Sequence, residues 1–169
     1  MDFKLIGLTK YVDLIKIPQI RNRVMDVAIN LAIPFNRWLG MKIIAMSAVQ
    51  VRVSSPPRTL RRNHVGGAHA CALALLGEYP AGVLISQTYS MQDYRMIIAK
   101  LDVEYFKQGR GTLIGEATAP SQWPEEKDGE VWLELQTEIK NEKGEMVAVA
   151  KTKWQLKKWE LIKTKAKSI

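Results

Sequence analysis

The uncharged run of residues 66–77 constrains the fold of this chain more than any other feature. It begins within the polar, glycine-containing segment 63–69 and is followed directly by Glu78. A helix that is apolar on all sides is normally buried, so the run predicts a central helix inside a core. A carboxylate in such a helix is costly to ionise without a partner. Glu78 is therefore the first candidate for a functional residue, because groups with perturbed ionisation concentrate at functional sites.

The composition predicts one globular domain. Of the 169 residues, 47% are hydrophobic and 25% are charged, which is ordinary for a protein with a proper core. The apolar runs fall short of the roughly 20 residues that a membrane span needs, and no secretory signal is visible. The one cysteine, Cys71, cannot form an internal disulfide, and its place in the apolar helix favours core packing. We therefore expect a reducing, cytoplasmic location.

The basic charge lies at the two ends of the sequence. Residues 1–62 carry a net charge of +8, residues 63–150 carry −6, and residues 151–169 carry +6. Such ends could bind nucleic acid, an anionic lipid surface or a phosphate-bearing small molecule, or could serve solubility alone. The lysines of the C-terminal tail favour a solvated end. Specific nucleic-acid binding is disfavoured, because the chain has no zinc-finger spacing and no aromatic RNA-binding motif.

The periodicity of apolar residues predicts helices first and strands later. Apolar residues recur at three- and four-residue steps between residues 14 and 39, interrupted by Pro18 and Pro34, which predicts an N-terminal helical extension over residues 1–40. Alternation over residues 43–53 predicts a first strand that stops at the prolines of positions 56 and 57. The central helix is expected to run to about Glu78 and to be closed by Pro80 and Gly82.

Downstream of that helix the pattern predicts antiparallel strands over residues 83–89, 96–106, 111–119, 131–140 and 145–157. Residues 141–144 supply the turn of a hairpin between the last two strands, and residues 108–111 predict a similar turn between the second and third. A sheet of about five or six antiparallel strands around one helix is an α+β arrangement. The expected organisation is a helical extension (1–40), a main domain (41–157) and a basic tail (158–169).

Four positions in this order resemble a known family. Asn63, Gly66 and His69 match the Asn, Gly and His of an N-x-x-G-x-x-H motif, and Glu78 follows the histidine by nine residues. This pattern resembles the hotdog-fold thioesterases, specifically the phenylacetate-degradation and small acyl-CoA branch. The resemblance covers residues 41–157, and the extension resembles that of uncharacterised hotdog proteins grouped with thioesterases. It implies a hotdog fold and thioester hydrolysis without a metal or a separate cofactor.

The resemblance also implies roles for these residues. Glu78 would be general base or nucleophile, and Asn63 would orient the attacking water or the substrate carbonyl. The amide of Ala70, with a smaller contribution from His69, would polarise the carbonyl at the positive end of the helix. Glu78 would act with Asn63 of the partner subunit, so a homodimer or a dimer of dimers is expected. One departure is that the family usually reads His-Gly-Gly where this chain has His69-Ala70-Cys71.

The expected substrate is a thioester of coenzyme A or of an acyl carrier protein. Phosphates of coenzyme A could be received by arginines, and an acidic carrier protein would be steered by the basic ends. The expected substrate-binding residues are His64, Gly66, Gly67, Arg58, Arg61, Arg62 and Arg110.

Structural explanations exist for each candidate. Glu78 could pair with an arginine, Asn63 could only cap a turn, and His69 could be structural. The tryptophans are expected to pack in the core or at interfaces. Competing functions are a non-catalytic acyl-thioester binding protein and a hydroxyacyl-thioester dehydratase, since His64 precedes Glu78 by fourteen residues as in that branch. An acyl-CoA-sensing transcription factor would need a DNA-binding module, for which the extension is too short and too interrupted by proline.

Overall fold

The computed structural model describes residues 14–33 and 35–166. The helices are α3 (Pro18–Ala32), α4 (Phe35–Leu39), α5 (Ala70–Thr88) and α6 (Trp159–Ala166), with a 3-10 turn η1 (Thr59–Arg61). The strands are β1 (Lys42–Met46), β2 (Gln50–Ser55), β3 (Tyr94–Tyr105), β4 (Leu113–Thr118), β5 (Glu130–Asn141) and β6 (Met146–Lys158). The helices expected between residues 14 and 39 are thus confirmed, whereas residues 1–13 of the predicted extension lie outside the described residues.

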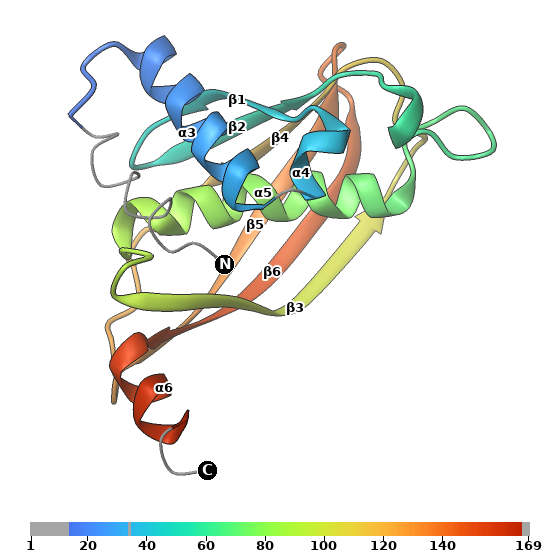
Figure 1. Ribbon diagram of the computed structural model, residues 1–169. Helices are drawn as coiled ribbons and strands as arrows, with labels where there is room; N and C mark the ends of the chain where they lie inside the picture. Colours follow the sequence, from blue (N-terminus) through green and yellow to red (C-terminus); the bar gives the residue numbers. More distant parts are fainter. Residues whose placement is uncertain (1–13, 34, 167–169) are drawn as a thin grey trace.

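The six strands form one antiparallel sheet in the order β1-β2-β4-β5-β6-β3. The sheet curves around α5, and α3 lies beside β1 at one edge while β3 forms the opposite edge (Figure 1). Inward-facing residues of the strands alternate with outward-facing ones, most regularly in β2, β4 and β5. The prediction of an α+β fold with an antiparallel sheet wrapped around a central helix is confirmed.

Helix α5 approaches the sheet closely at two glycines. A Cβ added at Gly77 would lie 2.3 Å from the Cβ of Ala150 on β6, and one added at Gly115 on β4 would lie 2.6 Å from the carbonyl oxygen of Leu76. Neither neighbour is the end of a flexible side chain, so both contacts require glycine. The buried residues of α5 therefore pack directly against the strands.

The prediction that the central helix ends near Glu78 was wrong. Helix α5 continues through Pro80 to Thr88, so residues 83–89 are helical and not a strand. Proline removes the N–H that would bond to the carbonyl of Leu76 and normally disfavours a helix interior. Here one face of the second half of the helix is buried, with Ala81, Leu84 and Ile85 at 0% exposure. Burial of this apolar face outweighs the local cost of the proline. By length and composition α5 could span a membrane, but it is the core helix of this sheet.

Two strand predictions also need correction. The expected strand over residues 43–53 is the antiparallel pair β1 and β2, joined by a turn in which the N–H of Ser47 donates to the Gln50 carbonyl at 2.9 Å. Residues 108–111 do not close a hairpin, because β3 pairs with β6 whereas β4 lies between β2 and β5. The predicted hairpin of β5 and β6 is confirmed, and its turn is closed by the Gly144 N–H donating to the Asn141 carbonyl.

The basic C-terminal tail is not simply a solvated end. Residues from Trp159 onward form α6, and the indole N–H of Trp159 donates to the carbonyl of Met91 at 3.1 Å. The backbone N–H of Trp159 also donates to the carbonyl of Asp93 at 3.0 Å. These two bonds hold the start of α6 against the segment that leads into β3.

Helix α3 is joined to the sheet and to α5 by one carboxylate. Asp26 accepts a hydrogen bond from the Ile43 N–H at 2.8 Å and another from the Tyr79 hydroxyl at 3.4 Å. Met25 and Ile29, on the same side of α3, belong to the main core. Burial raises the pKa of Asp26 from its ordinary value of 3.8 to about 6, although both hydrogen bonds act in the opposite direction.

The close contact at Gly77 predicts the effect of a one-carbon substitution. Gly77→Ala should lower the free energy of unfolding by roughly 1–3 kcal/mol, because the clash with Ala150 exceeds the gain in helix propensity. Urea unfolding of the purified protein measures this. The double variant Gly77→Ala with Ala150→Gly should recover part of the loss, whereas equal destabilisation of the two variants would contradict the packing described.

The raised pKa of Asp26 predicts a dependence of stability on pH. Since the folded pKa lies above the unfolded one, the folded state favours the protonated carboxyl, and this contribution is lost as pH rises from about 4 to about 6. Asp26→Asn keeps an oxygen acceptor and cannot ionise. The free energy of unfolding of the wild type, relative to this variant, should therefore fall across that window in urea titrations. Parallel pH profiles for the two proteins would count against the assignment.

Candidate active site

One strip along α5 is only partly covered by the chain's own sheet. Its members recur at three-, four- and seven-residue spacing and are exposed or half-buried: Cys71, Ala74, Leu75, Glu78, Gly82 and Ser86. Cys71 is exposed, so its prediction as a core residue was wrong. The reason is its position on this strip, since the sheet covers the other faces of the helix. We call these six residues the open strip of α5, and Glu78 lies near its middle.

Glu78 combines partial burial with the absence of a partner. In the described part of the chain its carboxylate has no hydrogen bond and no ion pair. The pairing with an arginine that the sequence left open is therefore not found there. Burial raises the pKa of the Glu78 carboxyl, and burial is the cause identified for the shift. A half-buried carboxylate without a counter-charge is the kind of group that accepts a proton readily from a bound reactant.

A tryptophan lies close to Glu78 across a glycine. A Cβ added at Gly82 would lie 3.2 Å from the ring of Trp154 and 4.0 Å from Glu78 Oε1. Trp154 is buried on β6, and its indole Nε1 has no acceptor among the described residues. The expectation that Trp154 only packs in the core missed this proximity. The available sequence signal was Gly82, a residue without a side chain one turn after the carboxylate.

The start of α5 offers one free backbone donor. The His69 ring accepts the Cys71 N–H at Nδ1 over 3.1 Å, and the His69 carbonyl accepts from Ala72 and Leu73 at 2.9 and 3.1 Å. His69 is therefore the N-cap of the helix. The N–H of Ala70 is the first of the helix and has no acceptor in the part of the chain that the structure describes. It lies at the positive end of the helix dipole, where a developing oxyanion is stabilised.

Asn63 holds the loop that precedes α5. Its Oδ1 accepts from the N–H groups of Val65 and Gly67 at 3.1 and 3.0 Å, and its Nδ2 donates to the Ala68 carbonyl at 3.4 Å. These are the contacts of the turn-forming role that the sequence also allowed. The two lone pairs of Oδ1 are used, which leaves one N–H of Nδ2 to donate to a ligand. Gly66 has a φ of +78° in this turn, which favours glycine.

The structure does not bring Asn63 and Glu78 together within one chain. Nine residues separate the N-cap from Glu78, a distance of roughly 14 Å at the rise of an α-helix. Ala70 and Glu78 are separated by roughly 12 Å for the same reason. The backbone positions of the donor and of the carboxylate in one chain are therefore more than two helical turns apart.

The candidate phosphate-binding residues divide into two groups. Arg61 is buried at 3% exposure and donates to the Ser55 carbonyl at 2.7 Å and to the Gly111 carbonyl at 2.6 Å, so it holds the fold and is not free for a ligand. The other predicted residues are exposed on the surface: Arg58, Arg62, His64 and Arg110.

Two of the exposed residues are placed by local contacts. Arg110 donates to the Gln108 side chain at 3.0 Å, and Gln108 donates to the Val65 carbonyl at 3.1 Å. Arg110 thus lies by the loop that begins α5, whereas Arg58 lies against Gly40. The sequence did not indicate Tyr105, whose hydroxyl donates to the Ala70 carbonyl at 3.2 Å from β3. No group of three or more metal-binding side chains is arranged for a metal ion among the residues the structure describes.

Solved structures with the same fold are numerous. A protein of unknown function from Pseudomonas aeruginosa, described as a probable thioesterase, is 21% identical with a TM-score of 0.66 over 76% of this chain and 90% of its own. A mutant of a thioesterase from Staphylococcus aureus is 15% identical with a TM-score of 0.63, over 73% and 98%. A thioesterase from Haemophilus influenzae is 16% identical with a TM-score of 0.60, over 71% and 80%. The likeness confirms the predicted hotdog fold, shared with thioesterase-like proteins.

Comparison at the level of sequence is less specific about activity. No curated protein matches the chain significantly. A sequence model described as "Domain of unknown function (DUF4442)" matches residues 21–156, which include most of α3, the whole of α5 and nearly all of the sheet. Because this match spans most of the chain, the protein belongs to the DUF4442 family.

Proposed function

We propose that this protein is a thioester hydrolase in which Glu78 is the general base or nucleophile. The observation that carries the proposal is the carboxylate itself: it lies on the open strip of α5, its pKa is raised by burial, and it has no counter-charge among the described residues. The folded chain has no need of a carboxylate at this position. Several of the structures that share the fold are described as thioesterases, which supports the same class of reaction.

The active unit is a homodimer formed through β3. This strand of twelve residues lies at the end of the sheet, pairs with β6 on one side only and carries exposed apolar side chains, including Ile97 at 43% and Leu101 at 39%. An unpaired edge strand of this length and character favours association with another strand. A two-fold partner at this edge would also cover the open strip of α5, which faces β6 and β3.

Each site is then shared between two protomers. The Ala70 N–H of one protomer polarises the thioester carbonyl, and Glu78 of its partner takes a proton from water as the water attacks. The carbon–sulfur bond breaks, the proton passes to the thiolate, and the products are a carboxylic acid and a thiol. If Glu78 attacks directly, water cleaves the resulting anhydride in a second step. The free Nδ2 N–H of Asn63 helps to hold the substrate carbonyl.

The substrate is an acyl thioester of coenzyme A or of an acyl carrier protein. Arg62, His64 and Arg110 are exposed near the N-terminus of α5, where they can meet the phosphates of either carrier. Arg58 is a more distant candidate because it lies beside Gly40. Such a reaction, and the unpaired Cys71, suit the reducing cytoplasm.

Two observations favour a second candidate, an acyl-thioester binding protein without turnover. Oδ1 of Asn63 already accepts hydrogen bonds from two backbone N–H groups, so it cannot also accept one from an attacking water. Ala70 also replaces the glycine usual in the resembled family, which brings a side chain closer to a bound carbonyl. Binding of an acyl-CoA with no release of thiol would identify this function.

Replacement of Glu78 tests the carboxylate directly. Glu78→Gln should reduce free-thiol release from the best of a panel of short, medium, long and aromatic acyl-CoAs by at least about a hundredfold, as expected for loss of a general base. Glu134→Gln, an exposed glutamate on β5, is the matched control and should stay at the wild-type rate. Because the pKa of Glu78 is raised and the base must be ionised, kcat/KM should rise with pH through a value above 4.5. An unchanged rate in Glu78→Gln would remove it from the mechanism.

Mixing two variants tests whether the site is shared. Glu78→Gln and Asn63→Ala should each be impaired as homodimers. After refolding together, about half of the dimers are mixed and each holds one intact site, so about a quarter of the wild-type activity should return. The refolded mixture is assayed for thiol release and its dimer is checked by sedimentation. If both residues act within one chain, every site in the mixture retains one defect and no activity returns.

A further inference from the structure

The outward face of α3 carries an apolar stripe that stays exposed in the part of the chain that the structure describes. Its members recur at alternating three- and four-residue steps and are each 39–54% exposed: Ile17, Ile20, Val24, Val27 and Leu31. The opposite face of the same helix packs into the core through Met25 and Ile29. Helix α3 is thus apolar on two faces, and one of them faces outward.

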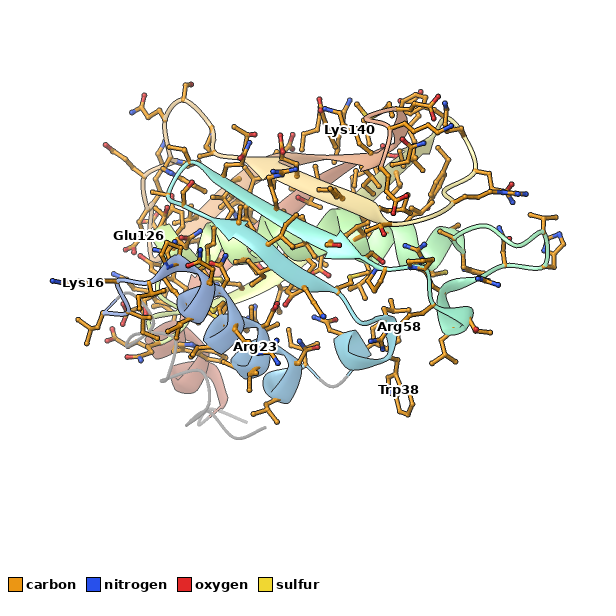
Figure 2. All side chains as sticks on the ribbon, turned by 90° about the horizontal axis from the view of Figure 1, so that it is seen from above. Lys16, Arg23, Trp38, Arg58, Glu126 and Lys140 are labelled. Atoms are coloured by element: carbon orange, nitrogen blue, oxygen red, sulfur yellow. The ribbon has the colours of Figure 1, made fainter. Side chains whose placement is uncertain are left out.

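Two aromatic residues of α4 extend this stripe. Phe35 is 68% exposed and Trp38 is 67% exposed, the largest exposures of any aromatic side chain in the described chain. Figure 2 shows Trp38 pointing away from the body of the protein. Soluble monomers rarely expose a contiguous apolar patch of this kind unless it binds something. These seven residues are called the α3–α4 stripe below.

Basic side chains flank the α3–α4 stripe. Lys16 lies at the start of α3, Arg23 lies along it and Arg58 lies beside α4 (Figure 2). None of the three forms an ion pair in the described part of the chain. Between residues 14 and 62 the only acidic residue is Asp26, which is half-buried and turned toward Ile43 and Tyr79. The exposed charge contributed by this segment is therefore positive.

We propose that the α3–α4 stripe docks the protein on an anionic phospholipid surface. Exposed apolar residues along a helix insert into the headgroup region, and tryptophan favours this depth. Lysine and arginine beside the inserted residues are attracted by anionic headgroups. A second copy of the chain is a poorer occupant, because a symmetric contact through this face would bring like charges together.

The proposed docking surface is separate from the proposed site. Helix α3 lies beside β1, at the opposite edge of the sheet from β3, so an adsorbed protein keeps β3 free for a partner (Figure 1). The inference therefore goes beyond thioester hydrolysis and does not depend on it.

Vesicle sedimentation with the full chain tests the proposal. The probes are vesicles of phosphatidylcholine alone and of phosphatidylcholine with phosphatidylglycerol, each at low and high salt. The wild type should sediment with the phosphatidylglycerol vesicles and less so as salt rises. Val24→Gln with Val27→Gln should weaken binding by at least about tenfold. Arg23→Gln should weaken it by about fivefold, the effect of one charge at such a surface.

Matched control variants distinguish binding through the α3–α4 stripe from nonspecific adsorption to the vesicles. Trp38→Ala should lose binding, whereas Trp132→Ala, an exposed tryptophan on β5, should bind like the wild type. Lys143→Gln, an exposed lysine in the turn between β5 and β6, is the control for Arg23→Gln. Circular dichroism checks that each variant is folded, and thiol release from a soluble acyl-CoA should be equal in all of them.

Three results would overturn the proposal. The first is an absence of binding to anionic vesicles at low salt by the full chain. The second is equal binding to both vesicle types, and the third is equal binding by the stripe variants and their controls. In the first case, a smaller species in sedimentation velocity for Val24→Gln with Val27→Gln would identify a second copy as the occupant.

Discussion

The close contact between α5 and the sheet determines where every candidate functional group lies. Gly77 and Gly115 let the helix backbone reach β6 and β4 at distances that a side chain would prevent. At this separation the sheet covers most faces of the helix and leaves the open strip half-covered. Pro80 is tolerated because the apolar residues after it are buried. The same contact places Glu78 near Gly82, whose position is also close to the ring of Trp154.

Two different physical constraints produce the two halves of the proposed site. At the start of α5, the hydrogen bonds of His69 occupy three of the first four N–H groups and leave the Ala70 N–H free. In the middle of the helix, burial raises the pKa of Glu78 and no counter-charge among the described residues opposes it. Because the backbone positions of these groups lie roughly 12 Å apart along the helix, we propose that they act together across two protomers.

Sequence patterns predicted those parts of the fold in which local and tertiary preferences agree. The alternation in β5 and β6 and the turn at residues 141–144 identified the hairpin, and the uncharged run identified the central helix. The length of that helix was misjudged because Pro80 is locally unfavourable and only tertiary burial stabilises it. The split between β1 and β2 was missed because the turn after Met46 contains neither glycine nor proline. The placement of β3 beside β6 depends on long-range pairing that no local pattern encodes.

The parts of the candidate site that depend only on neighbouring residues in the sequence could be predicted. Glu78 and the Ala70 amide follow from the apolar run and from the start of a helix, and their catalytic roles stay a prediction. Arg61 was indistinguishable from its neighbours in the sequence, because its role depends on the carbonyls of Ser55 and Gly111. The exposure of Cys71 and the proximity of Trp154 to Gly82 depend on which face of α5 the sheet leaves open. Both features depend on the tertiary structure and cannot be predicted from local sequence.

A crystal structure of the protein with an acyl-CoA analogue, in which a methylene group replaces the thioester sulfur, tests the central claim most directly. The account predicts a dimer joined through β3, with the analogue's carbonyl oxygen within hydrogen-bonding distance of the Ala70 N–H of one protomer. Glu78 of its partner should lie within reach of the carbonyl carbon, directly or through one water. An analogue bound away from the open strip of α5, or a carbonyl contacted by neither group, would contradict the account.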